Sequence, residues 1–276
     1  AIDANLFFDS DDRLWMSYGS WSGGIFLLEL DPETGAVIYP GEDSETSDGR
    51  MIDRYFGTKI SGGYTKSGEG PYIQYNPNTN YFYLYVTYGW LGADGGYHVR
   101  QFRSENPDGP YLDADNQPAV LPGDVNHAQY GNKLFGNFMF KRELGEPGMG
   151  PGVGYLSPGH NSVFLDEETG EEFLVFHTRF PNRGEAHELR IHQMFLNKHD
   201  WPVVAPKRYA GEQLDQELSI GDLIGDYKYI NHGKDNSAEL KETQIIRLHE
   251  DGTITGAIDG TWSHDGYYAT ITINNI

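Results

Sequence analysis

The chain has 276 residues, contains no cysteine and carries a formal net charge of −21 at pH 7. The lack of cysteine excludes disulfides and thiolate sites, and the negative charge argues against nucleic acid and anionic membranes as partners, because phosphate binding needs clustered Lys and Arg. No apolar run approaches the roughly 20 residues that span a membrane. A neutral substrate fits this composition, although the charge alone also fits a surface that serves only solubility.

Strand-like segments recur along the chain as three copies of one pattern. Each copy has an apolar inner strand, a polar turn, two further strands and a short apolar piece. The first copy comprises residues 5–8, 14–18, 24–30 and 36–38; the second 68–73, 81–88, 97–103 and 118–121; the third 159–164, 172–178, 188–196 and 202–204. Two glycine-rich insertions, residues 40–67 and 105–158, separate the copies and are predicted to be long loops.

Repeated four-stranded units that pack only on their neighbours are typical of β-propeller blades. We therefore predict an all-β fold in which residues 1–212 form blades of a propeller. Three copies are too few to close a propeller, which has at least four blades, so the chain is expected to hold only part of one. A different alternation begins after a boundary near residues 213–222. It predicts that residues 221–276 form a small β-barrel or sandwich, expected to be truncated because strand-like sequence reaches the last residue.

Three polar residues stand at the start of the inner strand in the three copies, namely Asp3, Glu69 and His160. Because the inner strands of a propeller border its axis, these side chains are predicted to converge on one point. Most enzymes that hydrolyse a glycosidic bond use two carboxyl groups on opposite sides of a pocket. The glycines on both sides of Glu69 leave room for a substrate. Taken one at a time, the same residues also fit a strand-end cap, a surface turn and a hydrogen-bonded histidine.

Four sequence segments that surround these residues carry a resemblance to a known family. They are residues 1–3, 14–20, 67–72 and 157–162. Together they make the chain similar to glycoside hydrolase family 43, and within it to the larger endo-α-1,5-L-arabinanases, which have a C-terminal β-barrel module. The resemblance implies the later blades of a five-bladed propeller, an extracellular location, and hydrolysis of α-1,5-linked L-arabinan or arabino-oligosaccharides with inversion at the anomeric carbon.

The resemblance also implies roles for individual residues. Glu69 matches the general acid, Asp3 the carboxylate that orients and tunes that acid, and His160 a ligand of a metal ion, usually calcium, near the propeller axis. Ser20 matches a residue that lines the substrate groove. The general base of the family is an aspartate on the first blade, and no residue here matches it. The base is therefore expected from sequence outside this chain, either a missing N-terminal part or a second polypeptide.

Other readings of the sequence stay open at this point. The same resemblance covers exo-acting arabinanases, arabinofuranosidases and xylosidases, because insertions that shape the substrate groove decide between them. A propeller that binds sugar without cleaving it is the alternative outside the enzymes. The C-terminal module either binds polysaccharide or braces the propeller.

Overall fold

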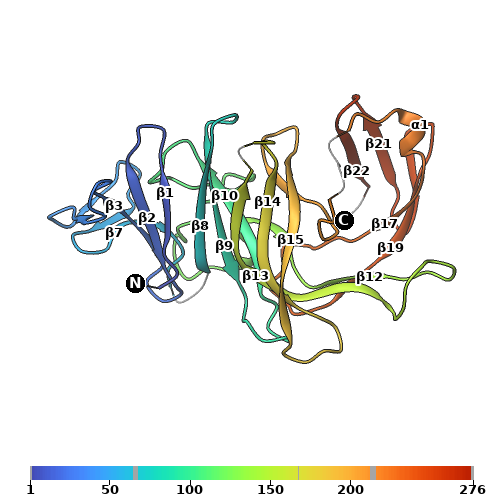
Figure 1. Ribbon diagram of the computed structural model, residues 1–276, viewed down its shortest axis with the longest axis horizontal. Coiled ribbons are helices and arrows are strands. Elements are labelled where there is room, and N and C mark those ends of the chain that lie inside the picture. The colour runs from blue at the N-terminus through green and yellow to red at the C-terminus, as the bar shows by residue number, and fades with distance from the viewer. Residues whose placement is uncertain (1, 65–67, 167, 212–215, 275–276) are drawn as a thin grey trace.

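The computed structural model describes residues 2–64, 68–166, 168–211 and 216–274, and the regular secondary structure of this part of the chain is almost entirely β. Three twisted sheets stand side by side along the long axis of the molecule, and a fourth sheet lies at the C-terminal end (Figure 1). The described residues contain one four-residue helix, α1 (Ile220–Leu223), and one turn of 3-10 helix at His127–Gln129. They contain no helix that is long and apolar enough to cross a membrane.

The first sheet is built from the first copy of the repeat and from part of the insertion that follows it. Its strand order is β1-β2-β3-β7-β6-β5, with β4 paired to β3. The strands are β1 (Asn5–Phe8), β2 (Leu14–Gly19), β3 (Ile25–Leu30), β4 (Val37–Ile38), β5 (Ser44–Glu45), β6 (Met51–Asp53) and β7 (Gly57–Ser61). The predicted long loop over residues 40–67 is therefore wrong in part, since three short strands extend the sheet there.

The second and third sheets follow the predicted copies closely at their inner strands. The second has the order β11-β10-β9-β8, and the third has the order β16-β15-β14-β13-β12-β18, where β18 is Lys241–Glu242. Their strands are β8 (Glu69–Asn76), β9 (Tyr81–Tyr88), β10 (His98–Ser104), β11 (Asn132–Phe135), β12 (Phe138–Lys141), β13 (Gly152–Leu165), β14 (Glu172–Arg179), β15 (His187–Leu196) and β16 (Pro202–Val204).

The outer strand of the second copy is not where the sequence placed it. We predicted it at residues 118–121, but β11 takes that position beside β10. The predicted segment instead lies against the first sheet, where the N–H of Gly62 donates to the carbonyl of Ala119 at 2.8 Å. The reason is burial, because Ala119 belongs to the apolar core between the first two sheets. The insertion over residues 105–158 is thus not one loop, and it supplies both β11 and β12.

Alternation along β9 explains how the sheets stack. Residues 82, 84, 86 and 88 join the core shared with the first sheet, whereas Tyr83 and Tyr85 join the core shared with the third. Successive side chains of a strand point to opposite faces of the sheet, so a strand that is apolar on both faces is sandwiched between two neighbours. Hydrogen bonds tie the inner strands together, from the N–H of Ile73 to Asn5 Oδ1 at 2.8 Å and from the Tyr72 hydroxyl to the carbonyl of Val163 at 2.9 Å. These features confirm the predicted propeller-type fold.

The C-terminal module is a five-stranded antiparallel sheet around a small core of its own. The strands are β17 (Gly225–Tyr229), β19 (Gln244–Leu248), β20 (Thr253–Gly256), β21 (Gly260–His264) and β22 (Ala269–Ile273), in that order. Trp262 and Ile254 are among the buried residues of this core. The predicted small β module is confirmed, whereas its boundary near residues 213–222 falls partly on residues 212–215, outside the described residues, and stays a prediction.

The module is joined to the third sheet by a strand of its own. β18 (Lys241–Glu242) lies between β17 and β19 in the sequence, yet it pairs in parallel with β12. The Lys241 N–H donates to the carbonyl of Asn137, and the Thr243 N–H donates to that of Met139, each at 3.1 Å. The third sheet therefore contains chain from both parts of the molecule.

Candidate active site

Glu69 opens β8, and donors from two sheets hold its carboxylate. Oε2 accepts hydrogen bonds from the indole Nε1 of Trp21 at 2.8 Å and from the Ser20 hydroxyl at 3.2 Å, both in the turn after β2. Oε1 accepts a hydrogen bond from the hydroxyl of Tyr97, just before β10. Hydrogen bonds to a charged acceptor are worth about 1.5–3 kcal/mol each, so these donors fix the orientation of the half-buried carboxylate.

Asp3 and His160 face each other at the inner ends of the first and third sheets. His160 Nε2 lies 3.8 Å from Asp3 Oδ1, and the side chains are 43% and 17% exposed. Both residues adopt positive backbone φ angles, 57° for Asp3 and 50° for His160. A residue other than glycine pays about 1–3 kcal/mol for such a conformation, which persists only where the surroundings enforce it and which is common at functional sites.

The second sheet connects Glu69 with His160. Thr87 stands opposite Glu69 in the pairing of β8 with β9, and its Oγ1 accepts the backbone N–H of His160 at 2.9 Å. A Cβ added to Gly70 would come within 3.2 Å of the His160 ring. The structure thus brings Asp3, Glu69 and His160 together at the inner ends of three sheets. Their chemical roles stay predictions.

Glycine at position 159 permits the close approach of the second and third sheets. A Cβ there would lie 2.5 Å from Thr87 Cγ2 and 2.6 Å from Tyr97 Cδ1. Any larger side chain would push against the ring that donates to Glu69. The absence of a side chain at Gly159 therefore lets β13 lie close to Thr87 and Tyr97.

Burial keeps the groups around the carboxylate neutral. It raises the pKa of the Tyr97 phenol, and the hydrogen bond to Glu69 raises that pKa further, so Tyr97 stays a hydroxyl donor. The ring of His177 on β14 stacks on Tyr97 with centroids 5.8 Å apart and planes 15° from parallel. Burial, followed by the nearby His160, lowers the pKa of His177 to about 4. Tyr97 and His177 thus add no charge to the surroundings of Glu69 at neutral pH.

Sequence reasoning missed Tyr97 and Trp21 as hydrogen-bond donors to Glu69. The sequence predicts Tyr97 only as the first residue of a strand. Trp21 lies in a turn with a φ of 44°, and its indole Nε1 donates to Glu69. Ser20 was predicted to line the substrate groove, and in the structure its hydroxyl is bonded to Glu69. Contact between Ser20 and a substrate stays a prediction.

The residues around His160 do not by themselves form a calcium site. Calcium takes six to eight oxygen ligands, whereas here one imidazole stands near one carboxylate. Among the described residues, no group of three or more His, Asp and Glu side chains is placed to hold a metal ion. A calcium ion at His160 would need most of its ligands from water.

Comparisons with known proteins agree with this geometry. Residues 1–202 match glycosyl hydrolases family 43, and residues 206–276 match a C-terminal lipocalin-like domain that accompanies this family. The chain is 48% identical to extracellular endo-alpha-(1->5)-L-arabinanase 2 of Bacillus subtilis over 96% of its own length and 54% of the relative's. It is 43% identical to an extracellular endo-alpha-(1->5)-L-arabinanase of Thermotoga petrophila, over 99% of the chain and 55% of the relative.

A solved structure gives the same result. The crystal structure of endo-1,5-alpha-L-arabinanase from Thermotoga petrophila RKU-1 superimposes with a TM-score of 0.88 at 42% identity, over 99% of this chain and 58% of that one. The chain therefore spans a little over half the length of the relatives that it matches. Those relatives are single longer chains, and they give no support to the predicted second polypeptide.

Proposed function

The chain belongs to glycosyl hydrolase family 43, and we propose that the protein of which it forms part cleaves internal α-1,5 linkages of L-arabinan. One observation carries the proposal: Glu69 is held by Ser20, Trp21 and Tyr97 at the place where the three inner strands meet. The endo-arabinanase names of the relatives support the choice of substrate. Their description as extracellular supports an extracellular location.

In the proposed reaction Glu69 donates a proton to the oxygen that leaves the anomeric carbon. Its carboxyl group then carries the negative charge, which the indole of Trp21 and the hydroxyls of Tyr97 and Ser20 stabilise by hydrogen bonds. Asp3, the second carboxylate of the site, is proposed to favour the protonated form of Glu69 by like-charge repulsion before the bond breaks.

Inversion requires a water molecule on the opposite face of the sugar, activated by a base about 6.5–9.5 Å from the acid. The position of that base outside this chain stays a prediction. His160 lies beside Asp3 and is proposed to help fix the Asp3 carboxylate. This role does not require a calcium ion.

Glu69→Gln tests the acid in the whole protein. General acid catalysis contributes typically 10²–10⁴-fold, so release of reducing ends from linear arabinan should fall by about that factor while binding of arabinotriose persists. An arabino-oligosaccharide with a 4-nitrophenyl leaving group should be cleaved with a much smaller loss, because nitrophenolate leaves without a proton. Glu29→Gln, a half-buried carboxyl on β3, is the matched control. Equal losses on both substrates would contradict the assignment of the acid.

The products distinguish the mode of cleavage. Cleavage inside the polymer should give a ladder of oligosaccharides from linear arabinan at early times. A single small product from the start would show exo action, and binding of oligosaccharides with no new reducing ends in the whole protein would show a sugar-binding propeller.

A further inference from the structure

A cavity lies at the outer ends of the second and third sheets, away from Glu69. Its volume is about 430 Å³, and β11, β12 and β16 contribute to its walls. Glu69 is on the inner strand β8, at the other end of the second sheet from β11. Protein interiors are otherwise packed with few voids larger than a water molecule, and the volume falls in the range of sites that enclose a small molecule.

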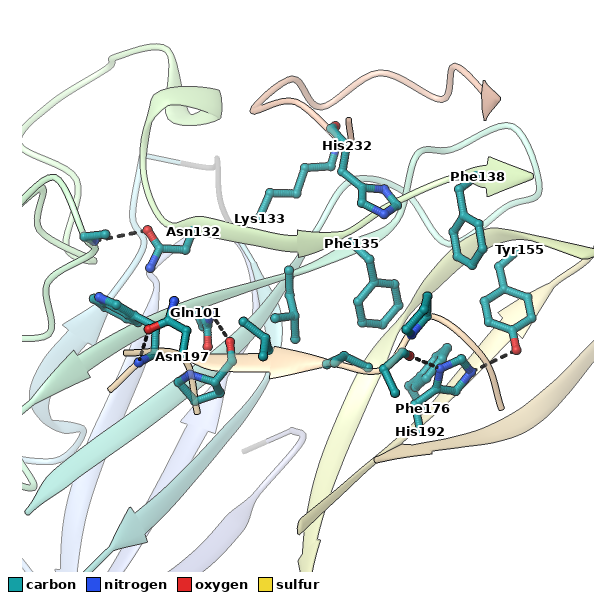
Figure 2. A pocket seen from close by; sticks show the side chains of 18 of the residues that line it. Gln101, Asn132, Lys133, Phe135, Phe138, Tyr155, Phe176, His192, Asn197 and His232 are labelled. Atoms are coloured by element: carbon teal, nitrogen blue, oxygen red, sulfur yellow. Dashed lines mark hydrogen bonds between the residues drawn. The ribbon is translucent and has the colours of Figure 1, made fainter. Parts of the chain in front are cut away.

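Aromatic rings form most of one wall of this cavity. Phe135 and Phe176 have centroids 4.9 Å apart, and Phe138 and Tyr155 have centroids 5.1 Å apart. Figure 2 shows Phe135, Phe138 and Tyr155 along one side of the space. Trp201 lines the cavity from the segment just before β16. These rings give several flat apolar surfaces on which a ligand with an apolar face can pack.

Three polar side chains that line the cavity, those of His232, Asn132 and Asn197, offer neutral hydrogen-bond donors. Burial lowers the pKa of His232 to about 4, and its Nδ1 accepts the N–H of Gly136 at 3.3 Å, so its proton is on Nε2. The Oδ1 of Asn132 accepts the N–H of Ala114 at 3.1 Å, and that of Asn197 accepts the N–H of Trp201 at 3.1 Å. In both amides the oxygen is already engaged, which leaves the NH₂ groups as the donors that a ligand would meet.

The cationic side chain at the cavity, Lys133, is already engaged by groups of the chain itself. Lys133 Nζ donates to the carbonyls of His232 and Asp235 at 3.0 and 2.9 Å, and lies 4.0 Å from Asp235 Oδ1. The net charge of −21 also opposes an anionic ligand. The cavity therefore favours a neutral molecule with acceptor oxygens and an apolar face.

We propose that this cavity is a second, non-catalytic binding site for one or two neutral sugar units of the polysaccharide. This inference rests on the proposed function, since a sugar has apolar C–H faces for the rings and oxygens for the three donors. Holding a second stretch of the same polymer would raise its effective concentration at the catalytic carboxylate. Aromatic molecules without sugar hydroxyls are the competing class of ligand.

Two tryptophans report separately on the two sites. Trp21 donates to Glu69, and Trp201 lines the cavity. We would label the Glu69→Gln variant with 5-fluorotryptophan, assign both ¹⁹F signals with Trp21→Phe and Trp201→Phe, and titrate arabinotriose and, separately, phenol. The proposal predicts that arabinotriose shifts the Trp201 signal in a saturable way. A Trp21 shift without a Trp201 shift would overturn the second site and leave the proposed function intact, and the reverse would overturn the proposed function only.

Variants of the cavity sharpen the test. Ala205→Leu fills the space, and Asn132→Ala removes a donor from β11. Each should weaken the arabinotriose-dependent Trp201 shift at least tenfold and leave the Trp21 titration unchanged. Val153→Leu, on an exposed position of β13, is the matched control. If only phenol shifts Trp201, or if both cavity variants titrate like the control, the saccharide assignment is wrong.

Discussion

The hydrogen bonds of Arg100 indicate how strongly the C-terminal module is coupled to the propeller. Its side chain is fully buried, and burial lowers the pKa of the guanidinium to about 10, which leaves it charged at neutral pH. Nη2 donates to Asn236 Oδ1 at 2.9 Å, and Nε donates to His98 Nε2 at 3.0 Å. Nη1 donates to three carbonyls of the second sheet's loop, those of Ala128, Tyr130 and Gly131, at 2.9–3.1 Å. One cation thus bridges the second sheet and the segment before β18.

Replacing Arg100 with Met keeps the apolar stem and removes every one of these bonds. Each lost bond destabilises the folded state by about 1.5–3 kcal/mol. Desolvating a buried guanidinium costs several kcal/mol, and because the variant avoids this cost, part of the loss is offset. We expect a net loss of about 3–5 kcal/mol, the usual result of removing one partner from a buried charged network. Urea unfolding monitored by far-UV circular dichroism measures the loss, and limited proteolysis between residues 206 and 224 shows whether the module separates.

The control for this experiment lies on the same strand. Arg103 donates to the carbonyls of His199 and Asp200 and covers the ring of Trp201, without a contact to the module among the described hydrogen bonds. Arg103→Met should cost about 1 kcal/mol, typical of a partly exposed site, and should not increase proteolysis at the junction. The reasoning fails if Arg100→Met unfolds at the same urea concentration as the unmodified chain, or if both variants lose equal stability.

Three further predictions follow from the site and its surroundings. Tyr97→Phe removes a donor to Glu69, so kcat on arabinan should fall about 10- to 100-fold, the equivalent of 1.5–3 kcal/mol, with little change in KM; a change confined to KM would contradict this. Burial lowers the pKa of His98 to about 3 and of His232 to about 4. Because the unfolded chain binds these protons at a higher pH than the folded chain, the free energy of unfolding should fall from pH 6.5 toward pH 4 by up to about 1.4 kcal/mol per pH unit for each histidine. A urea midpoint that stays constant over this range would refute the prediction. If His160 holds calcium, adding Ca²⁺ after chelation should raise the Tm of the unmodified chain and not that of His160→Ala.

The inner parts of the sheets were predictable from the sequence because their signals are local. Alternation and turn residues identify β9 from its own eight residues, and the repeat aligns Asp3, Glu69 and His160 without any knowledge of packing. The outer strand of the second sheet was not predictable. The apolar run at residues 118–121 and the strand β11 compete for one edge, and the core between the first two sheets decides between them.

The site shows the same division between local and long-range information. Trp21 and Tyr97 reach Glu69 from separate strands, so their role depends on how two sheets meet and on the angle of one turn. The cavity at the outer ends of the sheets lies further still from any local signal, because residues from β11, β12, β16 and the segment before β18 close it together. No window of sequence contains these residues side by side.

The strand that passes from the C-terminal module into the third sheet limits how the protein can be shortened. β12 has β13 on one side and only β18 on the other. A chain cut after residue 205 would present the N–H and C=O groups of residues 138–141 as an open edge, and open edges recruit strands from other molecules. Shortening at this junction should therefore yield self-associating material in place of a compact, smaller protein.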